Sequence, residues 1–187
     1  IPNDSKQKPS KKPDNKPDGN NSQSGNGQDG TSSNQSSSVD ATGKTTVKST
    51  KTISNKTLSS TKSDESAVLT KSSGKLTLKN VKVNKSGDSS NTENSEFYGV
   101  NAGLLTTKGG TTTVKDSKIT TSAKGANAVF ATGEKTKIYV QDTTINTTGE
   151  SSARGLDATY GGYIEADNVT INTKGGSCAT LATDRGE

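Results

Sequence analysis

The only two Arg residues of the chain each lie close to an Asp. Arg154 is followed by Asp157 and Tyr160 in the segment SSARGLDATYGGY. Asp184 directly precedes Arg185 in the segment ATDRGE. An aromatic ring can stack on the face of a sugar while carboxylate and guanidinium groups bind its hydroxyls. These residue types therefore suggest a glycan-binding surface, and a surface salt-bridge network is the structural alternative.

A second candidate lies in the segment NKSGDSSNTENSEFYG. It is polar and acidic, and it contains the aromatic pair Phe97 and Tyr98. Loops that project from a repeat scaffold commonly carry function. Ligand binding by Phe97 and Tyr98 is one hypothesis, and aromatic side chains that only cover the side of the scaffold are the other.

Catalysis has few candidates, because the sequence contains no His and a single Cys. A Ser-His-Asp triad, a Cys-His pair and a His/Cys zinc site are all excluded within this chain. Two carboxylates at a suitable separation can hydrolyse a glycosidic bond, so Asp157 and Asp184 are the catalytic candidates if the protein is an enzyme. No cofactor and no metal site are predicted. Calcium at an acidic corner is compatible with the sequence, but no motif supports it.

Composition divides the chain at about residue 45. Residues 1–45 contain three hydrophobic residues, whereas residues 46–187 contain 41 in 142. Because the first segment cannot bury enough apolar surface to offset its ordering entropy, it is predicted to be a disordered Lys/Pro-rich and then Ser/Gly/Asn-rich linker. No apolar run is long enough to span a membrane. The basic residues are dispersed among Thr and Ser, so no nucleic-acid partner is expected.

An internal repeat organises residues 46–187. The segments LTLKNVKV, TTVKDSKI, IYVQDTTI and IEADNVTI end at positions 83, 119, 145 and 171, with spacings of 36, 26 and 26. Each unit holds three short runs with the two-residue period of β-strands, and copies superimpose after a shift of one unit. The sequence therefore predicts an all-β fold, a right-handed single-stranded parallel β-helix with three sides and about five coils.

Alternate residues of each run are predicted to point inward and to stack in columns. The first run gives the columns Ala67/Ala102/Ala128/Leu156/Ala179 and Leu69/Leu104/Phe130/Ala158/Leu181. The second run gives the columns Leu76/Thr112/Ile138/Ile164 and Leu78/Val114/Val140/Ala166. The third run gives the columns Val81/Ser117/Thr143/Val169 and Val83/Ile119/Ile145/Ile171. Since Asn and Asp tolerate the left-handed backbone of a tight corner, a structural ladder is predicted between the second and third runs. Its members are Asn80, Asp116, Asp142 and Asn168.

Four phrases carry a resemblance to a known family: NSEFYGVNAG, KGANAVFATGE, ARGLDATYGG and CATLATDRGE. They resemble large secreted bacterial proteins, especially of Firmicutes, with pectin-lyase-like right-handed β-helix domains that are described as adhesin-like or carbohydrate-binding. The resemblance implies a secreted or cell-surface module that binds a polysaccharide, a host glycan or a cell-wall glycan, or that spaces other domains. The wider superfamily includes polysaccharide lyases and glycoside hydrolases, so a carbohydrate-active enzyme is the alternative. The catalytic Lys/Arg and calcium-carboxylate set of the pectate lyases has no match in this sequence.

Two further expectations concern the array itself. An ice-binding solenoid is disfavoured, because the Thr residues do not form the same pair on every coil and Lys interrupts the columns. The array stops after a first run that contains Ala179 and Leu181, without the polar cap that protects the end of a solenoid. Further C-terminal coils or domains of the same protein are therefore expected as partners.

Overall fold

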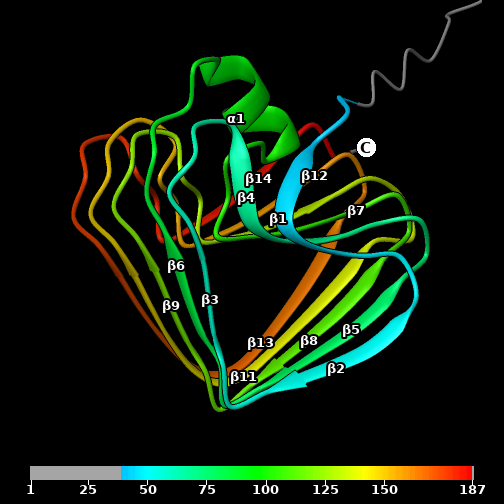
Figure 1. Cartoon of the computed structure of the whole chain (residues 1–187). Coiled ribbons are helices and arrows are strands. Elements are labelled where there is room, and N and C mark those ends of the chain that lie inside the picture. The colour runs from blue at the N-terminus through cyan, green and yellow to red at the C-terminus, as the bar shows by residue number, and fades with distance from the viewer. Residues whose placement is uncertain (1–38, 187) are drawn as a thin grey trace, which may run out of the picture. The chain divides into compact units, whose positions relative to one another are not determined.

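The computed structural model describes residues 39–186, which form a parallel β-solenoid with one short helix, α1 (Thr92–Tyr98) (Figure 1). From β1 (Thr42–Val47) to β2 (Thr50–Ser54) and β3 (Thr57–Ser60), the chain turns clockwise while it recedes from the viewer, so the coil is right-handed. Strands at equivalent positions of successive coils pair in parallel. The predicted all-β solenoid is confirmed.

The strands form three faces. The first face has six strands: β1, β4 (Glu65–Thr70), β7 (Leu104–Thr107), β10 (Val129–Thr132), β12 (Leu156–Thr159) and β14 (Leu181–Asp184). The second face contains β2, β5 (Lys75–Lys79), β8 (Thr111–Lys115) and the first halves of β11 (Lys137–Thr147) and β13 (Tyr163–Thr173). The third face contains β3, β6 (Lys82–Lys85), β9 (Lys118–Thr121) and the second halves of β11 and β13.

The N-terminal boundary of the solenoid differs from the prediction. Strand β1 begins at Thr42, four residues before the predicted domain start at Thr46. Its residues are mostly polar, but they pair with β4 through the backbone, where Gly43 is opposite Ser66 and Thr45 is opposite Val68. Backbone pairing does not require apolar side chains. The boundary predicted from hydrophobic content therefore lies too far toward the C-terminus. The predicted linker residues 1–38 lie outside the described residues.

The second and third faces have the predicted register. Ile138 pairs with Thr112 on one side and with Ile164 on the other, and Ile145 pairs with Ile119 and Ile171. Inward residues are buried and outward residues are exposed or half-buried along β5, β8 and β11. On these faces only one side of each strand meets the core, so the alternation of apolar and polar residues determines the register.

The predicted columns of the first face are wrong. Leu69 pairs with Leu105 rather than Leu104, and Leu105 pairs with Phe130. The inward column is Val68, Leu104, Val129, Leu156 and Leu181. The outward column is Leu69, Leu105, Phe130, Asp157 and Ala182. The middle strands of this face are buried on both sides, as in β10, so alternation could not distinguish inside from outside.

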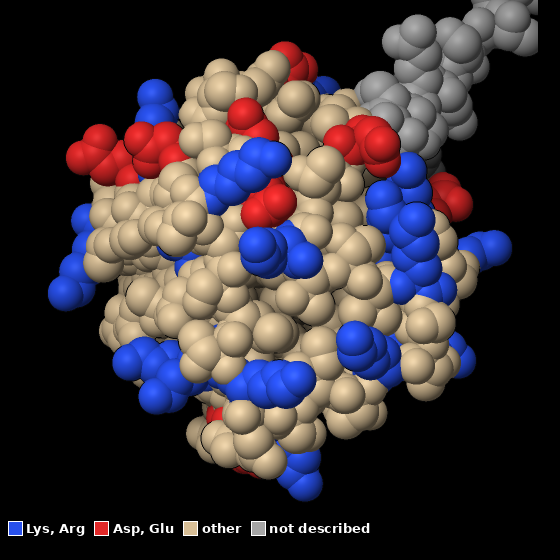
Figure 2. Space-filling view, viewed as in Figure 1, with Lys and Arg blue, Asp and Glu red and all other residues tan. Residues whose placement is uncertain are grey.

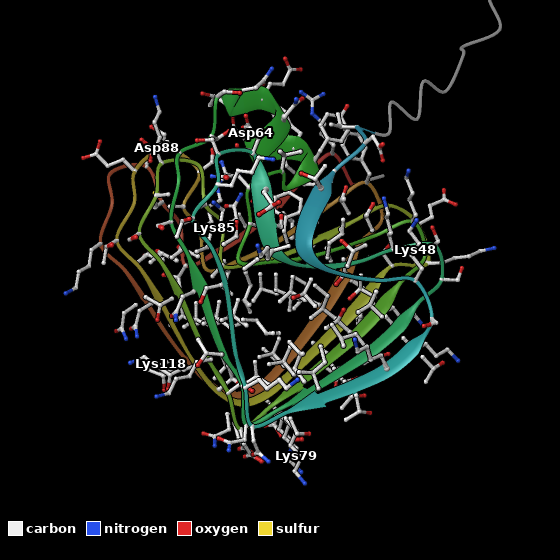
Figure 3. All side chains as sticks on the ribbon, in the orientation of Figure 1. Lys48, Asp64, Lys79, Lys85, Asp88 and Lys118 are labelled. Atoms are coloured by element: carbon white, nitrogen blue, oxygen red, sulfur yellow. The ribbon has the colours of Figure 1, made fainter. Side chains whose placement is uncertain are left out.

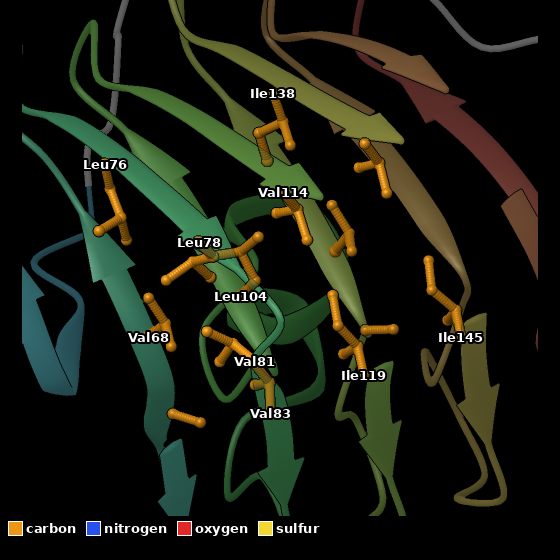
Figure 4. Packing of buried hydrophobic residues seen from close by; sticks show 14 of the residues in the cluster. Val68, Leu76, Leu78, Val81, Val83, Leu104, Val114, Ile119, Ile138 and Ile145 are labelled. Atoms are coloured by element: carbon orange, nitrogen blue, oxygen red, sulfur yellow. The ribbon is translucent and has the colours of Figure 1, made fainter. Parts of the chain in front are cut away.

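Two separate hydrophobic clusters result. The inner core fills the solenoid with stacked aliphatic side chains such as Leu78, Val114 and Ile145 (Figure 4). The outer cluster lies on the opposite side of the first face and consists of Ala41, Leu69, Val100, Ala102, Leu105 and Phe130. Tyr98, the last residue of α1, packs against it. The solenoid thus has a core inside its coil and a second one on its outer surface.

The predicted corner ladder is confirmed. All four of its members have left-handed backbone, with φ between 47° and 53°, and Asn55 extends the ladder into the first coil with φ 54°. Asn80 Nδ2 donates to Asn55 Oδ1 at 2.7 Å, and Asn168 Nδ2 donates to Asp142 Oδ1 at 2.7 Å. These bonds between coils offset part of the cost of the left-handed conformation.

The two ends of the described solenoid differ. In the first coil, Lys51 occupies the inward column next to Leu76 and is exposed. In the last two coils, Leu181 is 66% exposed and Tyr163 is 49% exposed, and they are the large hydrophobic residues most exposed within residues 39–186. No helix in that range is long and apolar enough to cross a membrane.

Candidate functional site

Helix α1 interrupts the 26-residue period between β6 and β7. Asn91 caps its N-terminus by accepting a hydrogen bond from the Asn94 amide at 2.9 Å, and Gly99 ends it with φ 67°. A Cβ on Gly99 would lie 2.5 Å from the Phe130 ring, so glycine also permits close packing on the outer cluster. The spacing of the repeat predicted an insertion here, but the helix was not predicted, although Asn91 and Gly99 are typical capping residues.

Buried polar side chains hold α1 against the first face of the solenoid. Asn127 Nδ2 donates to Ser95 O at 3.0 Å, and Thr159 Oγ1 donates to Phe97 O at 2.8 Å. Asn127 precedes β10 in the fourth coil, and Thr159 is the last residue of β12 in the fifth coil. The helix is therefore positioned by side chains that are remote from it in sequence.

Lys85 holds the beginning of the same insertion, a role that was not predicted from the sequence. Its side chain is only 2% exposed, and Nζ donates to the carbonyls of Lys62 at 2.9 Å, of Gly87 at 3.0 Å and of Ser86. Burial lowers the pKa of Lys85 to about 8. Three carboxylates raise that pKa by their charge, namely Glu65, Asp64 and Asp88. Figure 3 shows Asp64 and Asp88 on the same side of the solenoid as Lys85.

Arg154 links α1 to strand β12 through two ion pairs. Its Nη2 donates to Glu96 Oε1 at 2.7 Å, and its Nη1 donates to Asp157 Oδ2 at 2.8 Å. Asp157 is fully buried because it belongs to the outward column beneath α1, and its Oδ1 has no hydrogen-bond partner among the described residues. Burial raises the pKa of Asp157 to about 6, although the hydrogen bond and charge of Arg154 lower it.

Aromatic and charged side chains form a surface beside these ion pairs. The rings of Tyr98 and Tyr160 stack with centroids 5.3 Å apart and planes at 14°, and their hydroxyls are 3.3 Å apart. The Arg185 guanidinium lies 4.0 Å from the centroid of the Phe97 ring. The Asp184 carboxylate is exposed and accepts a hydrogen bond from the Arg185 amide at 2.7 Å. We call Phe97, Tyr98, Tyr160, Asp184 and Arg185 the α1 patch.

The structure brings together all seven residues predicted to bind a ligand, but in two layers. The α1 patch is the accessible layer, whereas Arg154 and Asp157 lie below α1. The expectation that Asp157 lies on the surface beside Asp184 is therefore wrong, since its register directs it under the helix. Of the surface salt-bridge network predicted as the alternative, the structure contains the pair of Arg154 and Asp157, but Asp157 is buried and the other partner of Arg154 is Glu96 of α1. Within residues 39–186 no group of three or more His, Cys, Asp or Glu side chains could hold a metal ion.

No family model matches the chain, and neither does any curated protein or solved structure. The function is therefore inferred from the geometry of the α1 patch and of the solenoid faces.

Proposed function

We propose that the protein is an adhesin-like module, secreted or attached to the cell surface, that binds a polysaccharide through the α1 patch. One observation carries the proposal: aromatic side chains from α1 meet an aromatic side chain and an Asp-Arg pair from two later coils. Three segments separated by at least 20 residues thus place rings and hydrogen-bonding groups on one surface.

The chemistry of the α1 patch suits a sugar. Carbohydrate rings present apolar C–H faces that pack on aromatic rings, and hydroxyl groups that pair with carboxylates, guanidinium groups and phenols. Tyr160 is half-buried and Arg185 and Asp184 are exposed, so ring, cation and carboxylate are accessible together. The anchored helix holds Phe97 and Tyr98 before a ligand arrives, which lowers the entropy lost on binding.

The test is a glycan array followed by calorimetry, with the whole chain and two variants. Tyr160→Ala removes the stacked pair, and we expect binding of the selected glycan to weaken by about tenfold or more. Tyr163→Ala is the matched control, because Tyr163 belongs to another aromatic pair, with Tyr139, on the second face. Equal affinities of the wild type and Tyr160→Ala for the glycan would refute the proposal that the α1 patch is the binding site. Absence of binding across the array would favour the spacer role.

The enzyme alternative has one observation in its favour, the raised pKa of Asp157, which is typical of a general acid. Against it, Asp157 is fully buried and paired with Arg154, so a substrate reaches it only if α1 moves. Release of reducing sugar by the wild type that disappears in Asp157→Asn would establish the enzyme. Binding without release would establish the adhesin-like role.

A further inference from the structure

A second surface lies at the corner between the second and third faces, on the side of the solenoid away from α1 (Figure 1). Five exposed Lys residues of the first three coils surround this corner: Lys56, Lys79, Lys82, Lys115 and Lys118. We call them the corner lysine patch. Basic side chains are visible over the lower part of the molecule in Figure 2, where Figure 3 labels Lys79 and Lys118.

The register places these Lys residues directly opposite one another. Lys79 pairs with Lys115 across β5 and β8, and Lys82 pairs with Lys118 across β6 and β9. Neighbouring parallel strands are about 4.8 Å apart, and like charges opposite each other on adjacent strands are destabilising. Two such pairs on either side of one corner therefore cost stability unless an anion lies between them.

Fewer carboxylates than lysines lie at this corner, where the ladder contributes Asp116 in the third coil and Asp142 in the fourth. Asp116 is the acidic residue of the ladder within these three coils, and none of the patch lysines takes part in an ion pair with another described residue. In the fifth coil the second face carries Glu165 and Asp167 instead. At this corner the lysines thus belong to the first three coils, and the later coils have Gln141, Asp167, Thr144 and Thr170 at the equivalent positions.

From this arrangement we infer that the corner lysine patch binds an anionic glycan strand that runs along the solenoid axis and carries sulfate or phosphate groups. Two pairs of ammonium groups, each pair separated by one coil, fit successive charged groups of such a polymer. A nucleic acid fits less well, because the patch has no aromatic side chain for base stacking and no Arg for bidentate recognition. The surface is separate from the α1 patch, so the inference does not depend on the proposed function.

The experiment compares two fourfold variants of the whole chain with identical net charge. The patch variant carries Lys79→Gln, Lys82→Gln, Lys115→Gln and Lys118→Gln. The control variant carries Lys48→Gln, Lys62→Gln, Lys124→Gln and Lys174→Gln, which are exposed lysines outside the patch. Binding of a heparin octasaccharide, which carries sulfate, and of glycerol-phosphate teichoic acid, which carries phosphate, is measured at several salt concentrations. The ligand that binds more tightly identifies the anionic group that the patch prefers.

We expect the patch variant to lose about tenfold or more in affinity and most of its salt dependence, while the control variant changes by about twofold or less. The patch variant should also unfold at the same or a slightly higher denaturant concentration, because two repulsive pairs are removed. Equal losses of affinity in both variants would show that binding depends only on the net charge of the protein, and this result would overturn the inference. No binding of either glycan would overturn it as well, and so would tighter, patch-dependent binding of single-stranded DNA with the same number of charges.

Discussion

The inner core and the outer cluster lie on opposite sides of the same first face, and they are built by different means. The inner core repeats one pattern in every coil and contains stacked aliphatic side chains. The outer cluster combines residues of the sheet with Val100 and Tyr98 from the insertion and Ala41 from before β1, and polar groups such as Asp157, Asn127 and Thr159 are buried on the same face. The repeated strands of this solenoid enclose an aliphatic interior, whereas the insertion with α1 covers a surface on which the ionisable side chain of Asp157 is buried.

The largest expected effect is a charge in the inner core. Ile145 is fully buried between Ile119 and Ile171, so Ile145→Asp leaves a carboxylate without a partner and should lower the free energy of unfolding by about 4 kcal/mol or more. Thr144→Asp is the control, because Thr144 points outward beside Lys118 and the change should stay within about 0.5 kcal/mol. Equal midpoints in denaturant titrations would contradict the described register.

The outer cluster should depend on its ion pairs. Arg154→Leu leaves Asp157 buried without its cation and should cost about 3 kcal/mol, and the double change to Leu at both positions should restore most of the loss. The surface pair Lys71–Asp40, with atoms 3.7 Å apart and Asp40 85% exposed, gives the comparison, since Lys71→Met should cost less than about 1 kcal/mol. A double variant no more stable than Arg154→Leu would show that packing of the Arg stem, rather than charge compensation, is lost.

A smaller effect should appear with pH. The pKa of Asp157 is about 6 in the folded protein and about 3.9 in an unfolded chain, so the folded state binds more protons between these values. Stability from this group is therefore highest below pH 4 and declines by about 1–3 kcal/mol as pH rises through 6. Unfolding titrations between pH 4 and 7 should show this decline in the wild type relative to Asp157→Asn. Parallel pH profiles for the two proteins would mean that Asp157 keeps an ordinary pKa.

The smallest expected effect concerns the corner ladder, which the repeat builds outside both clusters. Asp142 has φ 47°, so Asp142→Ala should cost about 1 kcal/mol, and Asp142→Gly should cost less because glycine adopts this conformation without strain. Denaturant midpoints for the two variants measure the difference. If Ala proves no worse than Gly, the hydrogen bond from Asn168, rather than the backbone conformation, is the main contribution at this corner.

Periodicity alone was sufficient for much of the molecule. It determined the solenoid, the columns of the second and third faces and the Asn/Asp corner, because each of these depends on contacts between residues one coil apart. It failed on the first face, where burial on both sides hides the alternation, and at β1, whose polar residues pair through the backbone.

The candidate site shows the same division. Its residue types were evident from the sequence, since the two Arg residues and the Phe97-Tyr98 pair break the repeat. Their meeting was decided only by the tertiary structure, because α1 folds back across three coils and brings Tyr98 to Tyr160, 62 residues away. Asp157 and Lys85 each combine a partner near in sequence with a distant one: Asp157 pairs with Arg154, which also binds Glu96 of α1, and Lys85 donates to the carbonyls of Gly87 and Lys62. Local periodicity specifies contacts with the next coil, and a non-periodic insertion is positioned only by the complete fold.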